Sequence, residues 1–367
     1  MNESRIIENK KVYLEVMRIF ATFFVIYNHT GLKGFLHHLT LEMMTLKYWV
    51  YLFLSIFCKF SVPLFLMISG ALLIKKKETN GRIFKVRITK IVIALIGVSF
   101  LHCICQLKDG GENFNLLHFF QVLLTGQWSA HLWYLYMFIV YLICLPILRV
   151  LANNMERKHF QYVIWVSLAI KLLSVIEFFL WQGKYGFNGY LKCEWFVSDI
   201  LLFPLVGHYL ENVVEIEKIN KKHLLVMWVI NIGFIMLMCY ATYYKIILTG
   251  DISEQEAQTF HNIIPIINAS AIYITVKYFC HKIICAEWIN RGTISLGKCT
   301  FGIYLFHLLI EGNQYIATVW MKINNFLHVY FGISHLVEML LYCTFIMIIS
   351  YFLILIMKKL PIIDKLI

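Results

Sequence analysis

The sequence is poor in charged residues for its length. Only 15% of its 367 residues are charged, whereas 60% are hydrophobic, and the mean hydropathy is +0.71. Proline is also rare, with 5 residues. So little charge cannot cover a soluble core with a polar surface, which excludes a soluble globular protein and favours a chain that lies in lipid.

Other features are missing, and each argues against a class of protein. The 10 cysteines have no zinc-type spacing, so we predict no bound metal. Short segments of alternating hydrophobicity are lacking, which argues against a transmembrane β-barrel. No internal repeat is evident, which counts against an inverted-repeat transporter. The first apolar block is not followed by a small-residue cleavage site, so we expect it to remain as a helix.

Long apolar blocks are what the sequence has instead. Blocks of roughly 18 residues or more can cross a hydrocarbon layer of about 30 Å as helices, at about 1.5 Å per residue. The sequence therefore predicts an all-α fold, a polytopic membrane helix bundle of about ten transmembrane helices in a single domain, 1–367. The predicted spans are 12–32, 48–74, 86–106, 131–151, 160–181, 196–212, 223–248, 261–280, 294–312 and 335–358. A shorter apolar stretch, 114–128, is predicted to be interfacial or re-entrant.

Lysine and arginine between the spans predict the orientation. With both termini cytoplasmic, the inner segments hold about 23 of these residues and the outer segments about seven. Anionic inner-leaflet lipid then explains the net charge of +12 without nucleic acid. On the outer side, we expect the adjacent His37 and His38 to face solvent and residues 313–334 to form a long loop.

Arg18 and His29 are ionisable residues inside the first predicted span. Charge in a bilayer costs several kcal/mol, so such residues are functional candidates. A spacing of eleven residues places them about 20° apart around a helix and roughly 16 Å apart along it. Arginine suits an anionic substrate and imidazole suits acid–base chemistry. The structural alternatives are a snorkelling Arg18 paired with Glu15 and an interfacial His29.

Polar residues in three other spans are further candidates. In the second span, Ser69 follows Pro63, a pattern that a kinked and closely packed helix also explains. The fourth span opens with His131 and Tyr134, which an interfacial aromatic belt would also explain. In the ninth span His307 and Glu311 share a helix face at i,i+4, so the carboxylate could orient the imidazole; polar packing is the alternative.

In this order, these segments resemble the acyltransferase 3 family, multi-spanning O-acyltransferases that modify bacterial surface glycans. The most specific elements are the arginine and histidine with ten residues between them, and the Val-Pro-Leu-Phe and Ser-Gly pieces of the next span. The matching pieces are Arg18 and His29, Phe60 to Gly70, His131 to Tyr134 with Pro146, and Gly302 to His307. The resemblance extends along essentially the whole chain.

The resemblance implies transfer of a short acyl group, usually acetyl, to a hydroxyl of a lipid-linked or exported saccharide. It implies acyl-CoA, most often acetyl-CoA, as the cytosolic donor substrate, with no tightly bound cofactor. It also implies a multi-pass protein of a bacterial cell (plasma) membrane. The expected partners are acyl-CoA, the saccharide acceptor, membrane lipids and proteins of a glycan assembly pathway, and not nucleic acid.

Roles for individual residues follow from the shared face of Arg18 and His29 as hypotheses. Arg18 would hold a phosphate or the thioester end of acyl-CoA, and His29 would act as general base. Lys85 and Arg87 in the basic inner loop would bind coenzyme A phosphates, unless that loop is only a topology signal. The candidate neighbours of the active site are Asn28, Ser69, His131, Tyr134, His307 and Glu311. A transporter or flippase for a lipid-linked glycan is the alternative function, and a membrane sensor without catalysis is a third.

Overall fold

The computed structural model describes residues 3–110, 113–181, 185–193, 198–250, 263–283 and 286–366. All regular secondary structure in these residues is helical, which confirms the predicted all-α class. The chain divides into two compact units, each built from two separate stretches. Unit 1 is Met1–Lys75 with Leu148–Gly297, and unit 2 is Lys76–Ile147 with Lys298–Ile367. Two helices, α7 (Trp133–Asn154) and α14 (Glu287–Glu311), have residues in both units.

Unit 1 contains eight further α-helices in its described residues. They are α1 (Glu3–Asn28), α2 (Leu46–Phe57), α3 (Ser61–Leu73), α8 (Arg157–Trp181), α9 (Gly189–Lys192), α10 (Asp199–Asn212), α11 (Lys221–Thr249) and α13 (Ile264–Lys282). Short 3-10 helices lie at Gly31–Lys33, His37–Thr40, Cys58–Phe60 and Ile216–Lys218. Helix α1 packs against α3 and α13, and α13 in turn packs against α11.

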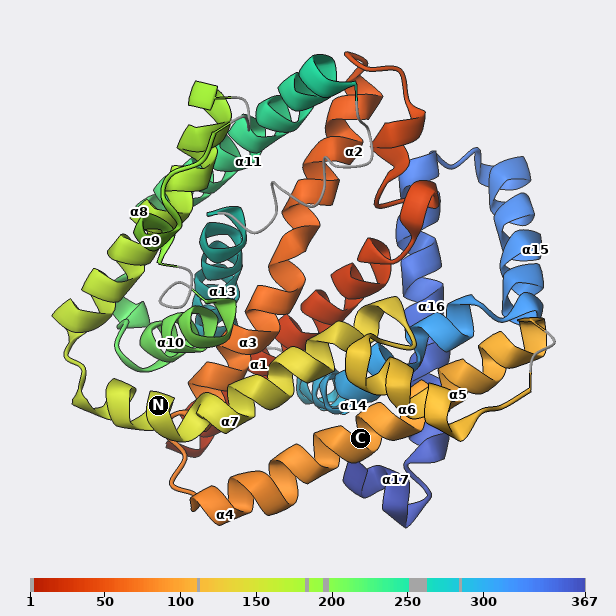
Figure 1. The fold of residues 1–367 in the computed structure, drawn as a ribbon, viewed down its shortest axis with the longest axis horizontal. Coiled ribbons are helices and arrows are strands. Elements are labelled where there is room, and N and C mark those ends of the chain that lie inside the picture. Colours follow the sequence, from red (N-terminus) through yellow and green to blue (C-terminus); the bar gives the residue numbers. More distant parts are fainter. Residues whose placement is uncertain are drawn as a thin grey trace. The chain divides into compact units, whose positions relative to one another are not determined.

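The tightest crossing in unit 1 joins α3 to α10, which Figure 1 shows in orange and green. A Cβ atom added at Gly70 would lie 2.0 Å from the Pro204 carbonyl oxygen, and one added at Gly207 would lie 2.0 Å from that of Met67. Only glycine lets two helix backbones approach so closely. The Ser-Gly piece of the second predicted span therefore serves helix packing through Gly70.

The second predicted span is one helical stretch whose geometry changes part of the way along it. Helix α2 ends at Phe57, a 3-10 segment follows at Cys58–Phe60, and α3 begins at Ser61. Pro63 has no N–H to donate to the carbonyl of Lys59, four residues earlier. The Cys58 carbonyl accepts hydrogen bonds from the backbone N–H and the hydroxyl of Ser61, three residues later.

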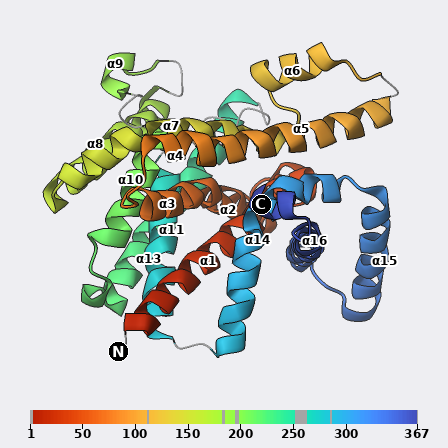
Figure 2. The ribbon, with the colours of Figure 1, turned by 90° about the horizontal axis from the view of Figure 1, so that it is seen from below.

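Unit 2 contains, besides its parts of α7 and α14, six α-helices in its described residues. They are α4 (Asn80–Arg82), α5 (Thr89–Gly110), α6 (Leu116–Thr125), α15 (Gln314–Phe331), α16 (His335–Met357) and α17 (Pro361–Leu366). A π-helical segment, Ile83–Ile88, joins α4 to α5, and a 3-10 turn, Ala130–Leu132, precedes α7. Helix α6 lies against α5 (Figure 2). It is a short helix, as expected for the 114–128 stretch.

Seven helical stretches in the described residues are long and apolar enough to cross a membrane. They are Leu46–Leu73, Asn80–Lys108, Ala130–Asn154, Arg157–Trp181, Lys221–Leu248, Glu287–Glu311 and His335–Met357. The other three predicted spans are also helical, as α1, α10 and α13. Helix α10 has 14 residues, or about 21 Å at 1.5 Å per residue, which is shorter than a straight crossing requires. The count of ten and the cytoplasmic termini stay predictions.

Two sequence-based expectations for the segments outside the spans are wrong. Residues 313–334 contain an 18-residue helix, α15, instead of a loop, and Trp320 of α15 packs against Tyr342 of α16. His38 is buried, with 1% exposure, and its ring lies against Tyr48. Burial removes water from the imidazole and lowers the pKa of His38 to about 4.

Candidate active site

Arg18 lies in the middle of α1 and forms an ion pair within that helix. Its Nη1 is 2.6 Å from Oε1 of Glu15, three residues earlier, as the structural alternative anticipated. The Glu15 side chain packs closely against Gly297 of α14. A Cβ atom added at Gly297 would lie 2.3 Å from its Oε2, so only glycine leaves room for the carboxylate there. The Arg18 side chain keeps 29% exposure, so the pairing orients the guanidinium without enclosing it. A guanidinium oriented in this way retains N–H groups for an anionic ligand.

His29 is the first residue after α1. Its backbone N–H donates to the carbonyl of Ile26, three residues earlier, so the helix tightens into a turn there. Helix α1 runs without a break from Arg18 to Asn28, as the predicted spacing of the pair requires. The His29 side chain is half-buried. The imidazole is thus neither fully enclosed nor fully exposed.

Asn28 connects the end of α1 to the 3-10 segment between α2 and α3. Its Nδ2 donates to the Cys58 carbonyl over 3.3 Å, and Nδ2 of Asn268 on α13 donates to the Phe57 carbonyl over 2.6 Å. The Cys58 carbonyl also accepts from the Ser61 hydroxyl over 2.8 Å, so the Asn28 amide is an additional donor there. Asn28, predicted as a neighbour of the active site, thus ties the end of α1, which His29 follows, to this segment.

Ser69 is bonded within its own helix. Its Oγ donates to the Phe65 carbonyl over 2.9 Å, four residues earlier on α3. This is the usual way in which a serine satisfies its hydroxyl in an apolar helix. Packing therefore accounts for Ser69, while its role as a polar neighbour of the site stays a prediction.

The structure brings His131 and His307 together in unit 2, although 175 positions separate them in the sequence. Their ring centroids are 5.0 Å apart, and the side chains are 1% and 0% exposed. Nε2 of His131 donates to the Leu305 carbonyl over 3.2 Å, which leaves Nδ1 to accept from Oγ of Ser129 over 3.0 Å. Nδ1 of His307 donates to the Tyr304 carbonyl over 2.7 Å. Both imidazoles are thereby fixed in orientation and tautomer.

Tyrosines and a third histidine complete this cluster. The Tyr304 hydroxyl donates to the carbonyl of His131, and the rings of Tyr304 and Tyr134 are 5.6 Å apart. His102 of α5, which the sequence did not single out, lies 5.4 Å from His131 between ring centroids. Contacts of this kind join the start of α7 to α5 and α14 and favour a structural role for the cluster.

Glu311 bonds to a residue that the sequence did not connect with it. Its carboxylate accepts a hydrogen bond from the hydroxyl of Tyr342 on α16. The predicted orientation of His307 by Glu311 stays a prediction, because the hydrogen bond of the His307 Nδ1 goes to the Tyr304 carbonyl.

The two basic residues predicted to bind coenzyme A phosphates differ in their surroundings. Arg87 forms a two-point hydrogen bond with Glu78, over 3.0 Å and 2.8 Å, and the Glu78 side chain is only 2% exposed. Lys85 is exposed. Lys85 is therefore the more accessible of the two cations for an incoming anion.

Sequence reasoning missed a buried carboxylate near the end of α10. Glu211 has a side-chain exposure of 3%, and its Oε2 accepts hydrogen bonds from the hydroxyls of Tyr13 and Tyr273 and lies 3.5 Å from Nζ of Lys277. These partners come from α1 and α13. An ionisable residue at the end of a predicted span is a signal that would have identified Glu211, but its partners are far apart in the sequence. The cluster joins three helices of unit 1.

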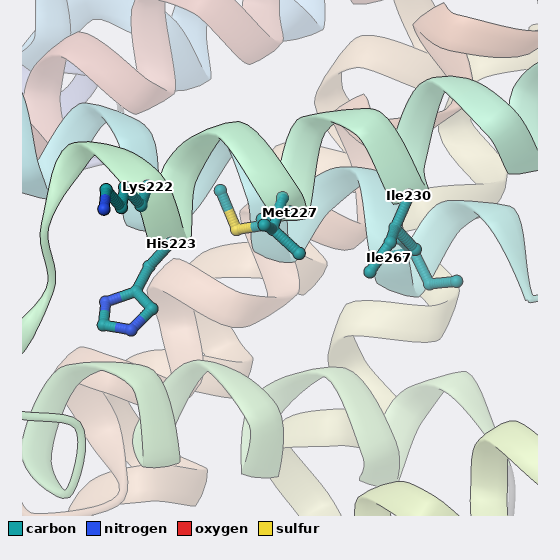
Figure 3. A pocket seen from close by; sticks show the side chains of 6 residues that line it. Lys222, His223, Met227, Ile230 and Ile267 are labelled. Carbon is teal, nitrogen blue, oxygen red and sulfur yellow. The ribbon is translucent and has the colours of Figure 1, made fainter.

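A shallow groove runs along α11 beside α13 (Figure 3). It is lined by Lys222, His223, Val226, Met227, Ile230 and Ile267. None of the predicted site residues lines this groove, and its walls are almost entirely apolar apart from Lys222 and His223.

Among the described residues, no group of three His, Cys, Asp or Glu side chains is arranged to hold a metal ion.

Comparison with known proteins gives one match. The family model described as an acyltransferase domain matches residues 11–356, which include Arg18, His29 and the histidine cluster. No curated protein and no solved structure matches the chain. Since the match covers nearly the whole chain, and the helices fit a multi-pass membrane protein, the chain belongs to the acyltransferase 3 family and is a membrane acyltransferase.

Proposed function

We propose that this acyltransferase moves an acyl group, most often acetyl, from cytosolic acyl-CoA to a hydroxyl of a lipid-linked or exported saccharide. It does so in the plasma membrane of a bacterium, within a glycan assembly pathway. Acyl-CoA is a substrate that binds and leaves, and the proposal includes no resident cofactor or metal. Family membership supports acyl transfer, whereas the donor, the acyl group and the acceptor are parts of the proposal.

The observation that carries the proposal is the pair of polar side chains on α1. Arg18 is aligned by Glu15 and remains partly exposed, and His29 follows the helix at a half-buried position. A guanidinium can bind the phosphates or the thioester end of acyl-CoA, and a neutral imidazole can take a proton from a hydroxyl. One helix thus carries a group for the donor and a group for the acceptor.

The basic segment that precedes α5 supports a cytosolic donor. Lys85 and Arg82 are exposed there, and Lys76 pairs with Glu78 at 50% exposure. Coenzyme A carries several phosphate charges, which such a segment would attract from solution. The same cations also suit anionic lipid, so the segment supports the donor assignment without defining a binding site.

A transfer assay with labelled acetyl-CoA tests the proposal. Membranes that contain the protein should incorporate label into the saccharide fraction as a base-labile ester, and membranes without it should not. His29→Ala should lower the transfer rate by about 100-fold or more, since general acid–base groups typically contribute 10²–10⁴-fold. Normal transfer by a stably folded His29→Ala protein would reject His29 as the base.

The same membranes separate the enzyme from a glycan transporter. If the protein only moved a lipid-linked saccharide, its loss would reduce export of the saccharide and leave acetyl-CoA unconsumed. The proposal requires the opposite result, in which export continues and the exported saccharide lacks its ester.

A further inference from the structure

The groove along α11 and α13 has a polar end and an apolar end. Figure 3 shows Lys222 and His223 at one end and Ile230 with Ile267 at the other, with Met227 between them. Eight positions separate Lys222 from Ile230, which corresponds to about 12 Å along a helix. The groove therefore changes from cationic to apolar along its length, as a phospholipid changes from headgroup to chain.

The cap of α11 holds the polar end in place. The Asn220 side chain accepts from the His223 backbone N–H over 3.0 Å, and Nδ1 of His223 accepts from the Asn220 backbone N–H over 3.3 Å. A neutral imidazole that accepts at Nδ1 carries its proton on Nε2, so His223 has a second nitrogen that donates. The N-terminal end of a helix adds a partial positive charge. This end of the groove thus suits an anion.

Lys222 supplies a full positive charge at the same end. Its side chain is exposed, and no carboxylate in the described part of the chain forms an ion pair with it. Lys218, four residues earlier, is different because its ammonium pairs with Glu215 over 2.6 Å. On the neighbouring α13, the Lys282 ammonium donates to the Tyr278 hydroxyl over 2.7 Å. The charge of Lys222 is therefore available to a ligand in the groove.

The floor of the groove is fixed by contacts between α11 and α13. Nε1 of Trp228 donates to Oγ1 of Thr275 over 2.9 Å, and Nδ2 of Asn231 donates to Oδ1 of Asn268 over 3.0 Å. Both asparagines are fully buried. Small and polar side chains of this kind hold neighbouring membrane helices together. The groove is consequently formed before anything binds in it.

The rim of the groove belongs to the surface that faces lipid. Val226 and Ile230 are exposed, as are Leu225 and Val229 beside them on α11. All four lie in Lys221–Leu248, a stretch long and apolar enough to cross a membrane. Exposed apolar side chains inside such a stretch meet hydrocarbon, whereas lysines at its end lie at the level of the headgroups. The apolar part of the groove thus opens toward acyl chains and the Lys222 end toward headgroups.

We propose that this groove binds one anionic phospholipid of the surrounding membrane. The phosphate lies against Lys222 and His223, where charge-assisted hydrogen bonds favour it, and one acyl chain follows the apolar residues of the groove to Ile267. Under the predicted orientation this end of α11 is cytoplasmic, where anionic lipid attracts basic residues. Because the lipid contacts α11 and α13 together, it stabilises their packing. The binding does not require the proposed acyl transfer.

Lipid binding to the purified full-length protein tests the inference. Native mass spectrometry of delipidated protein counts the lipids retained after addition of dioleoyl phosphatidylglycerol or dioleoyl phosphatidylcholine, which share their acyl chains and differ in net charge. We expect one phosphatidylglycerol to be retained per protein and the thermal midpoint to rise, because a ligand of the folded state stabilises it. Phosphatidylcholine should bind more weakly and raise the midpoint less.

Two neighbouring lysines test the polar end of the groove. Lys222→Gln removes the charge from the groove, and the matched control Lys221→Gln removes the same charge from an exposed residue outside it. Loss of a lysine near the headgroups should weaken the binding of phosphatidylglycerol by about 5-fold in Lys222→Gln. Lys221→Gln should retain this lipid nearly as the wild type does.

Two exposed valines test the apolar end in the same way. Val226→Phe fills the groove with a ring, whereas Val229→Phe makes the same change on the lipid-facing surface outside the groove. Phosphatidylglycerol should no longer be retained by Val226→Phe and should be retained normally by Val229→Phe. The thermal midpoint without added lipid shows that each variant is folded, and Ile230→Phe replaces Val226→Phe if the latter does not fold.

Four results would overturn the inference. Equal retention of the two lipids removes the role of the headgroup, and equal weakening by Lys221→Gln and Lys222→Gln shows general charge attraction instead of a site. Normal retention by a folded Val226→Phe protein places the acyl chain elsewhere. If a polyprenyl phosphate displaces phosphatidylglycerol at equal concentration, the groove belongs to a lipid-linked substrate. Retention as expected in a protein that transfers no label would leave the lipid site standing without the proposed function.

Discussion

His29 in unit 1 and His307 in unit 2 are both histidines at or near the end of a long helix, yet their surroundings differ. His29 is half-buried and follows α1 at a turn. His307 is fully buried, and its Nδ1 donates to a carbonyl of its own helix. The first arrangement leaves the imidazole partly exposed. The second uses imidazoles to hold helices together.

The same contrast holds for the groups around each histidine. Unit 1 supplies charged side chains on the elements around His29, with Arg18 on the helix that His29 follows and Lys59 on the 3-10 segment that Asn28 contacts. The unit 2 cluster is built from buried imidazole and phenol rings and hydroxyls, such as Tyr304 and Ser129. Reactions that develop charge are favoured by preorganised charges, whereas a buried network of hydrogen-bonded rings favours rigidity. Three predictions test this contrast.

The largest effect should come from Arg18. Arg18→Ala removes charge-assisted hydrogen bonds to the donor, which typically contribute about 1.5–3 kcal/mol, so the KM for acetyl-CoA should rise by about 10-fold to 100-fold. Arg18→Lys should have a smaller effect because it keeps the charge but not the planar fork. Transfer kinetics at several acetyl-CoA concentrations measure both. An unchanged KM in the alanine variant would reject the role of Arg18 in donor binding, and its ion pair with Glu15 would then be a structural contact only.

A smaller effect, on stability alone, is expected in unit 2. His131→Asn should remove the hydrogen bond from the imidazole to the Leu305 carbonyl and lower stability by about 0.5–1.5 kcal/mol, while the KM for acetyl-CoA stays at the wild-type value. Thermal unfolding of the purified protein and kinetics on the folded fraction measure the two quantities. His118, which is exposed on α6, offers the matched control His118→Asn. A His131→Asn protein of normal stability that no longer transfers label would move the cluster into the active site and end the contrast.

The smallest effect concerns pH. The pKa of His38 is lowered to about 4 by burial, from an ordinary value of 6.5, so between these values the unfolded chain binds a proton that the folded chain excludes. The contribution of His38 to stability is therefore present above pH 6.5 and is lost as the pH falls toward 4. Thermal midpoints across that range should fall less in His38→Gln than in the wild type. If the thermal midpoint falls equally with pH in the two proteins, this imidazole is in contact with water, as the sequence suggested.

Much of the fold could be predicted because apolar block length is a strong signal. Each of the ten predicted spans contains a helix in its described residues, and the 114–128 stretch contains a short helix. Helix α15 was missed because Lys322, Asn324 and His328 interrupt its apolar residues, and its buried contact depends on α16. The 3-10 segment at Cys58–Phe60 was not predicted, because the amides of Asn28 and Asn268 that bond to the carbonyls of Cys58 and Phe57 come from α1 and α13.

The candidate site was predictable where its residues lie on one helix. The spacing of Arg18 and His29 follows from helix geometry, as does the pairing of Arg18 with Glu15. Contacts between helices did not follow from the sequence. The neighbours of His131 and the partners of Glu211 depend on tertiary packing of segments far apart in the chain.

The division of the chain into interleaved units has a consequence for how the protein is made. Unit 1 is complete once residue 297 has been synthesised, whereas unit 2 needs both Lys76–Ile147 and the last stretch, Lys298–Ile367. Helices α5 and α7 are therefore synthesised before their partners in Lys298–Ile367. The second stretch of unit 1, Leu148–Gly297, is synthesised in between. A stop codon or proteolytic cut anywhere in the last stretch removes part of unit 2 and leaves every segment of unit 1 intact. Newly made protein should consequently acquire the surroundings of His29 before those of His307.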